Sequence, residues 1–169
     1  MNLIAAADSS WGIGLDGNLL YNIPADKSFF RSKTIGKTVV MGRRTYESLP
    51  SGSLPERRNI VLTRNPEYKG DENACICHST KEILTILSRI PDDDIFIIGG
   101  EQVYSIFQSQ CTHAFITKIL TSSPADRHLI NFDLSRDWTC ISVSEVMHYG
   151  DIPFCFAEYY RIKKQQENH

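Results

Sequence analysis

Short apolar runs, each closed by a turn or a helix signal, constrain the fold of this chain more than any other feature. They occupy residues 3–7, 38–41, 59–63 and 95–98. Runs of this length without polar alternation are typical of strands buried on both faces, and such strands belong to parallel sheets covered by helices. This part of the chain therefore predicts an α/β sheet.

Helix signals separate these runs. Pro24 stands at a first helical position, and Ser79 with Glu82 forms a capping box, in which the serine serves the backbone N–H near Glu82 and the glutamate reaches back. Pro50 must end a short helix opened at residues 42–45, because its ring blocks helical geometry in the preceding residue. Helices are therefore expected at residues 25–33, from 42 to before 50, behind Glu82, and at 101–107.

Bare strand patterns follow the last of these helices, at about residues 113–119, 138–147 and 154–163. Strands without intervening helices favour antiparallel pairing. The length of 169 residues fits one domain, taken as residues 1–169. The expected fold is a single α/β domain with a mixed sheet, mostly parallel with an antiparallel C-terminal edge, flanked by about four helices.

The polar segment after the first apolar run carries Gly12, Gly14 and Gly17 among the apolar residues Trp11 and Ile13. We expect a long loop here, a mobile flap with apolar anchors, because loops of this kind commonly carry binding functions.

Composition excludes several classes of protein. A net charge of −2 lacks the global basic footprint of a nucleic-acid coat, and no apolar stretch approaches the about 18 residues of a membrane span. The five cysteines are odd in number and scattered, which favours a reducing cytoplasm over a disulfide scaffold. Cys75 and Cys77 with His78 lack a second ligand pair at finger-like spacing, so no metal is expected.

Asp26 has two interpretations. It lies in the first turn of the expected helix, where an acid favours the helix dipole. Phe30, four residues later, shares its helix face. A carboxylate beside an aromatic wall suits a planar, amidine-like heterocycle, because the acid accepts two parallel N–H bonds while the ring binds the flat surface.

Two segments follow strands and open helices. Gly99 and Gly100 come directly after one apolar run, and residues 42–45 come after another. Paired glycines can be simply a turn, but they also permit a phosphate to approach a helix N-terminus. Two such N-termini near strand ends could bridge the pyrophosphate of a dinucleotide.

Residues 43–64 carry five arginines against two glutamates, a local charge of +3 in a slightly acidic chain. The arginines are Arg43, Arg44, Arg57, Arg58 and Arg64. A solvated basic face explains them without any ligand. The alternative is a site for anions, in which forked guanidinium groups bind phosphate or carboxylate.

Taken together, these segments resemble dihydrofolate reductase of the bacterial type over essentially the whole chain. The resemblance rests on Ile13-Gly14, on residues 23–26, 40–48, 54–60 and 98–100, and on Val103 with Tyr104. It implies NADPH-dependent reduction of 7,8-dihydrofolate to tetrahydrofolate, by hydride transfer from nicotinamide C4 to pterin C6 and protonation of N5 by water. It also implies a cis peptide between Gly99 and Gly100.

The resemblance implies the site residues as well. Asp26, Tyr21 and Thr117 are the expected catalytic group, although Tyr21 stands where most bacterial relatives have tryptophan. Expected to bind substrate are Ile4, Ala5, Ala6, Asp26, Lys27, Phe30, Leu49, Leu54, Arg57, Ile98, Tyr104 and Thr117. Expected to bind NADPH are Ala6, Ile13, Gly14, Asn18, Leu19, Gly42, Arg43, Arg44, Thr45, Leu62, Thr63, Arg64, Gly99, Gly100, Glu101, Gln102, Val103 and Tyr104.

Further roles follow from the same comparison of residues. Arg57 is expected to bind the glutamate carboxylate of the substrate, and Asp126 the backbone of the flap at residues 14–16. We expect Arg43, Arg44 and Arg64 near the 2′-phosphate of NADPH, because that dianion needs charge compensation.

Two other functions remain open at this point. One is a pyrimidine reductase of riboflavin synthesis on the same fold, which needs no pterin carboxylate. The other is a non-catalytic nucleotide-binding module. Under the reductase interpretation the partners are dihydrofolate and antifolate inhibitors, with no nucleic acid or membrane, and the protein is expected to be a cytoplasmic monomer.

Overall fold

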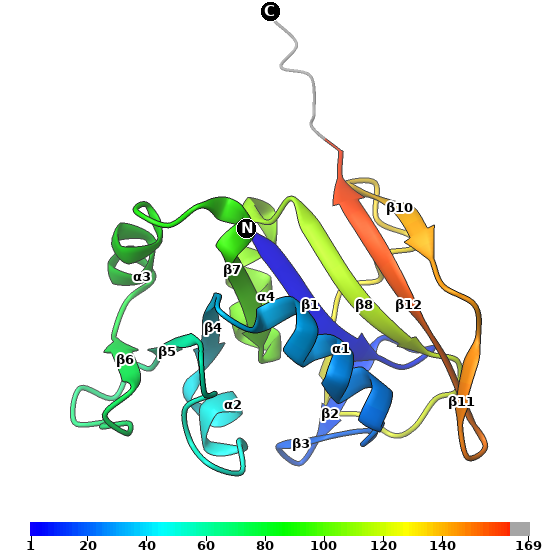
Figure 1. Cartoon of the computed structure of the whole chain (residues 1–169), viewed down its shortest axis with the longest axis horizontal. Helices are drawn as coiled ribbons and strands as arrows, with labels where there is room; N and C mark the ends of the chain where they lie inside the picture. Colours follow the sequence, from blue (N-terminus) through cyan, green and yellow to red (C-terminus); the bar gives the residue numbers. More distant parts are fainter. Residues whose placement is uncertain (163–169) are drawn as a thin grey trace, which may run out of the picture.

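The computed structural model describes residues 1–162, which form a nine-stranded mixed sheet with helices on both faces (Figure 1). The order along the sheet is β10-β12-β8-β1-β7-β4-β5-β6, and β11 pairs with β12. Strands β8, β1, β7, β4, β5 and β6 run parallel, whereas β12 is antiparallel to β8, β10 and β11. The mostly parallel sheet with an antiparallel C-terminal edge is therefore confirmed.

The strands of this sheet are short except for the last. They are β1 Asn2–Ala7, β4 Thr38–Gly42, β5 Arg58–Leu62, β6 Ala74–Cys77, β7 Ile95–Gly99, β8 His113–Ile119, β10 Trp138–Val143, β11 Met147–Tyr149 and β12 Ile152–Arg161. A separate three-stranded sheet has the order β3-β2-β9, with β2 Gly12–Leu15, β3 Asn18–Leu19 and β9 Arg127–His128.

Four α-helices and two 3₁₀ turns connect the strands. They are α1 Pro24–Thr34, α2 Arg43–Glu47, α3 Thr80–Leu87, α4 Glu101–Phe107, η1 Asp92–Asp94 and η2 Gln108–Gln110. In Figure 1, α1 lies in front of the sheet and α4 behind it. No helix within residues 1–162 is long and apolar enough to cross a membrane.

Alternate residues of the buried strands supply two separate cores. Leu3, Val40 and Ile97 pack in a cluster with residues of α3 and α4, whereas Ile4 and Val39 pack in a second cluster with residues of α1 and α2. Successive side chains of a strand point to opposite faces, so an apolar run fills both cores at once. This explains why the runs show no polar alternation.

Two expectations about the elements were wrong, and one strand, β6, was not predicted. The segment after β1 is a β2–β3 hairpin that also pairs with β9, because Gly14 faces Leu19 on one side and Arg127 on the other. Residues 75–77 belong to strand β6 beside β5. The strand expected at 138–147 ends at Val143, and β11 begins at Met147. Residue 163, the expected end of the last strand, lies outside the described residues, as do residues 164–169 of the expected domain.

The capping box at α3 is confirmed. The hydroxyl oxygen of Ser79 accepts from the backbone N–H of Glu82 at 3.2 Å, and the Glu82 carboxylate accepts from the Ser79 hydroxyl at 3.1 Å. The same carboxylate also accepts from the backbone N–H of His78 at 2.9 Å. Behind the cap, Ile83 and Leu87 are buried.

We predict that Ser79→Ala lowers the free energy of unfolding by about 1 kcal/mol, because an N-cap bond is lost at an exposed helix start. Chemical denaturation measures this change. Thr85→Ala, at an exposed position within α3, is the matched control and should not destabilise the protein. Equal unfolding free energies for Ser79→Ala and the unmodified protein would contradict the capping role.

Candidate active site

A hydrogen bond between Asp26 and Thr117 defines the candidate site. The Thr117 hydroxyl on β8 donates to Asp26 Oδ1 in the first turn of α1 at 2.6 Å. Thr117 is buried and Asp26 is half-buried. Within residues 1–162, no group hydrogen bonds to Asp26 Oδ2, so this oxygen can accept from a ligand.

Burial dominates the electrostatics of Asp26. Desolvation raises the pKa of its carboxyl above the ordinary value of 3.8, while the hydrogen bond from Thr117 and the charge of Lys27 oppose the rise. Lys27 itself is exposed. The site therefore holds a carboxylate that binds a proton more readily than an aspartate in water.

Tyr104 connects the floor of this site to the sheet. Its hydroxyl donates to the carbonyl oxygen of Ile4 at 2.8 Å, and its side chain is buried. Burial, and to a lesser degree the charge of Asp26, raise the pKa of Tyr104. Tyr104 thus remains a neutral donor, and it joins α4 to β1 beneath the carboxylate.

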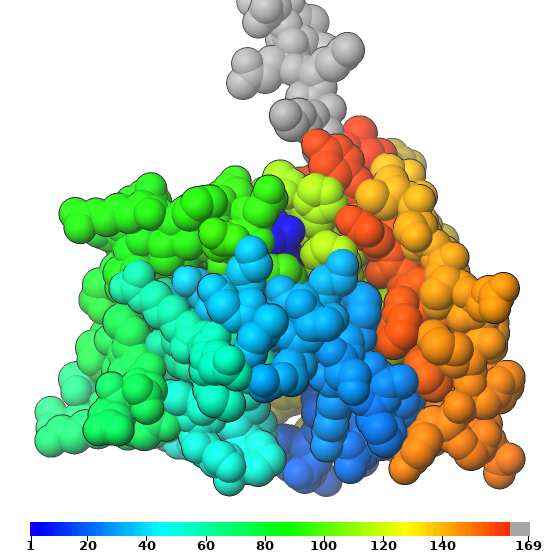
Figure 2. All heavy atoms as spheres, viewed as in Figure 1, coloured from blue at the N-terminus to red at the C-terminus, as the bar shows by residue number. Residues whose placement is uncertain are grey.

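Apolar residues of α1, of the segment between α2 and β5, and of β7 form a wall on the helix that carries Asp26. Phe30, Leu49, Leu54 and Ile98 are half-buried and pack on the same core cluster as Ile4. Figure 2 shows a hollow in the surface between the blue atoms of the hairpin and α1 and the cyan atoms that follow β4. The structure thereby brings five of the residues expected to bind substrate into one cluster, namely Ile4, Phe30, Leu49, Leu54 and Ile98.

Arg57 lies against this wall. Its guanidinium carbon is 5.9 Å from the ring centre of Phe30, Nη1 donates to Thr34 Oγ1 at 3.0 Å, and Nε donates to the carbonyl oxygen of Pro55 at 3.0 Å. Burial lowers the pKa of Arg57 from 12.5, and Arg31 adds to this effect. These two hydrogen bonds fix the guanidinium group of Arg57, and its remaining N–H groups can bind an anion.

Two glycine N-caps lie side by side at the ends of β4 and β7. Gly42 precedes α2 and Gly100 precedes α4, and neither helix has a side-chain cap. A Cβ at Gly42 would be 3.2 Å from Val103 Cγ2 and 4.0 Å from the Gly100 nitrogen, and one at Gly100 would be 3.3 Å from Thr45 Oγ1. The expected cis peptide joins Gly99 and Gly100. Side-chain-free backbone at two helix starts fits a phosphate-bearing cofactor.

The structure divides the arginine segment into two groups. Arg57 and Arg58 lie at the N-terminal end of β5, whereas Arg43, Arg44 and Arg64 follow the C-terminal ends of β4 and β5. The length of β5 separates the two groups, so the five arginines do not form one anion site. Arg57 lies in one group, whereas Arg43, Arg44 and Arg64, which were expected near the 2′-phosphate, lie in the other. Thr45, Leu62 and Thr63 lie with the second group, beside the glycine N-caps.

The second arginine group differs in the partners of its members. Arg43 is 3.7 Å from Glu47, and its guanidinium carbon is 5.7 Å from the ring centre of Tyr68. Arg44 and Arg64 are exposed and have no partner within residues 1–162. Their charges are thus the ones available to a ligand.

The hairpin closes the site on the other side. The backbone N–H of Asp16 donates to Asp126 Oδ2 at 3.2 Å, which is the contact expected of Asp126. Leu19 is 70% exposed at the hairpin strand β3, and Asn18 beside it is exposed too. Ile13 is half-buried in β2, next to the buried Gly14.

Sequence reasoning missed several residues of the site. Phe29 stacks on Phe156 with ring centres 4.2 Å apart. Ser123, which was not predicted, shares a hydrogen bond of 2.7 Å with the hydroxyl of Tyr21, which was. These partners lie far apart in the chain, so no local signal relates them. Tyr68 was also missed, although an aromatic residue close behind an arginine-rich segment is a usable signal.

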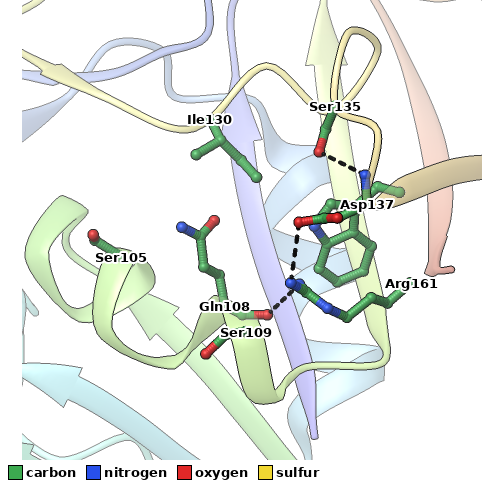
Figure 3. A pocket seen from close by; sticks show the side chains of 8 residues that line it. Ser105, Gln108, Ser109, Ile130, Ser135, Asp137 and Arg161 are labelled. Atoms are coloured by element: carbon green, nitrogen blue, oxygen red, sulfur yellow. Dashed lines mark hydrogen bonds and ion pairs between the residues drawn. The ribbon is translucent and has the colours of Figure 1, made fainter. Parts of the chain in front are cut away.

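A second pocket lies at the C-terminal end of α4 (Figure 3). The serines Ser105, Ser109 and Ser135 line it, and Arg161 donates from Nη1 to the Gln108 carbonyl oxygen at 3.0 Å. No residue expected to bind substrate or cofactor lines this pocket. It is therefore separate from the Asp26 site.

Comparisons with known proteins agree with this geometry. The profile of the family described as dihydrofolate reductase matches residues 1–161. A dihydrofolate reductase of Bacillus subtilis is 35% identical over 144 residues, which cover 84% of this chain and 82% of the relative. One from Staphylococcus haemolyticus is 31% identical over 167 residues, covering 96% of both chains.

A solved structure of dihydrofolate reductase from Enterococcus faecalis, complexed with NADP(H) and RAB-propyl, superposes with a TM-score of 0.82. It is 29% identical and covers 96% of each chain. These matches do not favour a pyrimidine reductase of riboflavin synthesis or a non-catalytic module. Their extent, together with the Asp26–Thr117 site and the paired glycine N-caps, places this chain in the dihydrofolate reductase family.

Proposed function

We propose that Asp26 is the carboxylate with which this chain carries out the NADPH-dependent reduction of 7,8-dihydrofolate to 5,6,7,8-tetrahydrofolate. One observation carries the assignment: a half-buried carboxylate accepts a 2.6 Å bond from Thr117 and keeps Oδ2 for a ligand. In this arrangement Asp26 accepts from the ring N–H and the exocyclic amine of the pterin. Phe30, Leu49 and Leu54 line the flat surface of the substrate, and Arg57 binds its glutamate carboxylate.

NADPH, when bound, supplies the hydride that reduces pterin C6. The chain binds its phosphates at the glycine N-caps Gly42 and Gly100, and the exposed Arg44 and Arg64 hold the 2′-phosphate. Water supplies the proton to N5, and the charge of Asp26 favours that protonation. The β2–β3 hairpin limits access of solvent to the site.

The remaining assignments follow from the same proposal. Antifolates compete for the pterin pocket, and the protein acts as a monomer without nucleic acid or membrane partners. None of the five cysteines, which all fall within residues 1–162, forms a disulfide there. This supports a reducing compartment, and we propose the cytoplasm.

The deciding experiment measures the loss of NADPH absorbance in the presence of dihydrofolate. For Asp26→Asn we expect an intact fold and a marked loss of turnover at neutral pH, because the amide offers one acceptor and a donor pair where the pterin needs two acceptors. Single-turnover kinetics measure the hydride-transfer rate. An unchanged rate in this variant would remove Asp26 from the mechanism.

The same variant changes the pH dependence of stability. Because the pKa of Asp26 lies above 3.8 in the folded protein, the ionised form costs stability as the pH rises through the folded pKa. Asp26→Asn should therefore be more stable than the unmodified protein at pH 7. This advantage should disappear as the pH falls below 3.8, where the carboxyl is protonated in both states. Thermal unfolding at several pH values measures it.

Arg64→Ala and Arg44→Ala should each weaken NADPH selectively. A charged hydrogen bond contributes roughly 1.5 to 3 kcal/mol, so we expect KM for NADPH to rise about ten- to a hundred-fold while KM for NADH stays near its original value. Arg58→Ala is the matched control, because Arg58 is exposed at the opposite end of β5. Equal changes for both cofactors would assign the two arginines to the solvated surface.

Asp126→Ala tests the contact between the hairpin and the later loop. It removes the acceptor of the Asp16 N–H and leaves the backbone bond from Asp126 N to the Gly14 carbonyl oxygen at 3.0 Å. We expect a change in cofactor release or in hydride transfer, measured by stopped-flow fluorescence and single turnover. If neither rate changes, while the exposed control Asp151→Ala is also silent, the coupling is wrong.

A further inference from the structure

A buried carboxylate that the reaction does not use lies at the end of β1. Asp8 is 4% exposed and accepts three backbone hydrogen bonds. Its Oδ1 accepts from Ser10 N at 2.9 Å and from Gly12 N at 2.8 Å, and its Oδ2 accepts from Ser123 N at 2.9 Å. Three N–H donors satisfy a buried charge without a cationic partner.

These donors belong to two different loops. Ser10 and Gly12 lead into strand β2 of the hairpin, whereas Ser123 belongs to the segment that leads to β9. A backbone bond from Ser9 N to the Thr121 carbonyl oxygen at 3.0 Å lies beside them. The side chain of Asp8 thus ties both loops, at residues 9–12 and at residues 121–123, to the end of β1.

The two loops are also tightly packed at this point. A Cβ on Gly12 would lie 2.7 Å from the Cβ of Ala125 and 3.2 Å from Asp8 Oδ1. Only glycine leaves room for both contacts. The absence of a side chain at Gly12 therefore lets the two loops approach closely enough for one carboxylate to accept from both.

Ser123 extends this contact to the catalytic group. Its backbone N–H donates to Asp8, and its hydroxyl shares the 2.7 Å hydrogen bond with Tyr21. Tyr21 and Ala6 pack on the same small core cluster, and Ala6 is the register partner of Thr117. The contacts thus lead from Asp8 through Ser123 to Tyr21. Tyr21 in turn packs near the β1–β8 strand pair, on which Thr117 donates to Asp26.

We propose that Asp8 and Ser123 are positioning residues, which fix the hairpin and the 121–128 loop together and set the orientation of Tyr21 beside the reaction site. The inference rests on the proposed function, because Tyr21 must lie near the reacting pterin for its orientation to affect turnover. Neither Asp8 nor Ser123 contacts substrate in this arrangement. Their loss therefore lowers kcat and leaves KM for dihydrofolate nearly unchanged.

Two variants remove the same hydrogen bond from its two sides. Ser123→Ala keeps the backbone N–H that donates to Asp8, and Tyr21→Phe keeps the ring. A neutral hydrogen bond contributes about 0.5 to 1.5 kcal/mol, so each variant should lower kcat roughly two- to ten-fold. The double variant Ser123→Ala/Tyr21→Phe should lose no more kcat than whichever single variant loses more, because both changes delete the same contact.

Ser122→Ala is the matched control, since Ser122 is the exposed neighbour of Ser123. It should retain the original kcat and KM. Asp8→Asn should lower kcat further than Ser123→Ala, because an amide has a single acceptor oxygen for three N–H donors. If Asp8→Asn does not fold, this shows that the protein needs the carboxylate, and the double-mutant cycle still decides whether Ser123 positions Tyr21.

Two measurements separate this proposal from the proposed function. A double-mutant cycle on the free energy of unfolding measures the Ser123–Tyr21 contact without any turnover, and steady-state kinetics with NADPH and dihydrofolate measure its effect on the reaction. Coupling in both cycles supports the proposal. Coupling in unfolding with an unchanged kcat, additive losses in kcat, or a rise in KM alone would overturn it. A failure of the proposed function would instead show as absent turnover in the unmodified protein.

Discussion

The hydrogen bond from Thr117 to Asp26 joins the two parts of the molecule on which the active site depends. Thr117 belongs to β8 in the interior of the sheet, and Asp26 belongs to the first turn of the helix that covers one face. The bond stabilises a carboxylate that burial would otherwise disfavour, since the two effects act on its pKa in opposite directions. The proposed substrate contacts are arranged around this acid, because its free oxygen determines where a heterocycle can lie.

Local sequence signals correctly predicted the strands and helices that depend on neighbouring residues in the chain. The buried runs gave β1, β4, β5 and β7 to within a residue or two, and Pro24 and the Ser79–Glu82 box marked the starts of α1 and α3. The hairpin β2–β3 was missed because β3 has only two residues, and because β2 also pairs with β9, far along the chain. Strand β6 was missed because Cys75, Cys77 and His78 were interpreted only as possible metal ligands. The strand forms by pairing with β5, a contact that no local sequence signal shows.

Some residues of the candidate site could likewise be predicted from the sequence, and others could not. Asp26, Phe30, the glycine pair and Arg57 came from residue type and spacing, together with the family resemblance. The count of charges along the chain did not by itself divide the arginines into two groups, because it ignores which end of a strand each residue occupies. The separate roles expected of Arg57 and of Arg43, Arg44 and Arg64 came from the family resemblance. Asp8 and Ser123 carried no signal either. A single acid after a strand is common, and its three partners are backbone groups that any sequence provides.

The place of β12 in the sheet has a consequence for how the chain is made. Residues Ile152–Arg161 lie between β8 and β10, although they are translated after both. Until these residues have left the ribosome, β10 has no partner strand. Strand β8, which carries Thr117, is then unpaired along one edge. At about 5 to 20 residues per second, the nascent chain spends several seconds in this state. During this time the open edge of β8 presents unpaired backbone groups, to which another strand could pair.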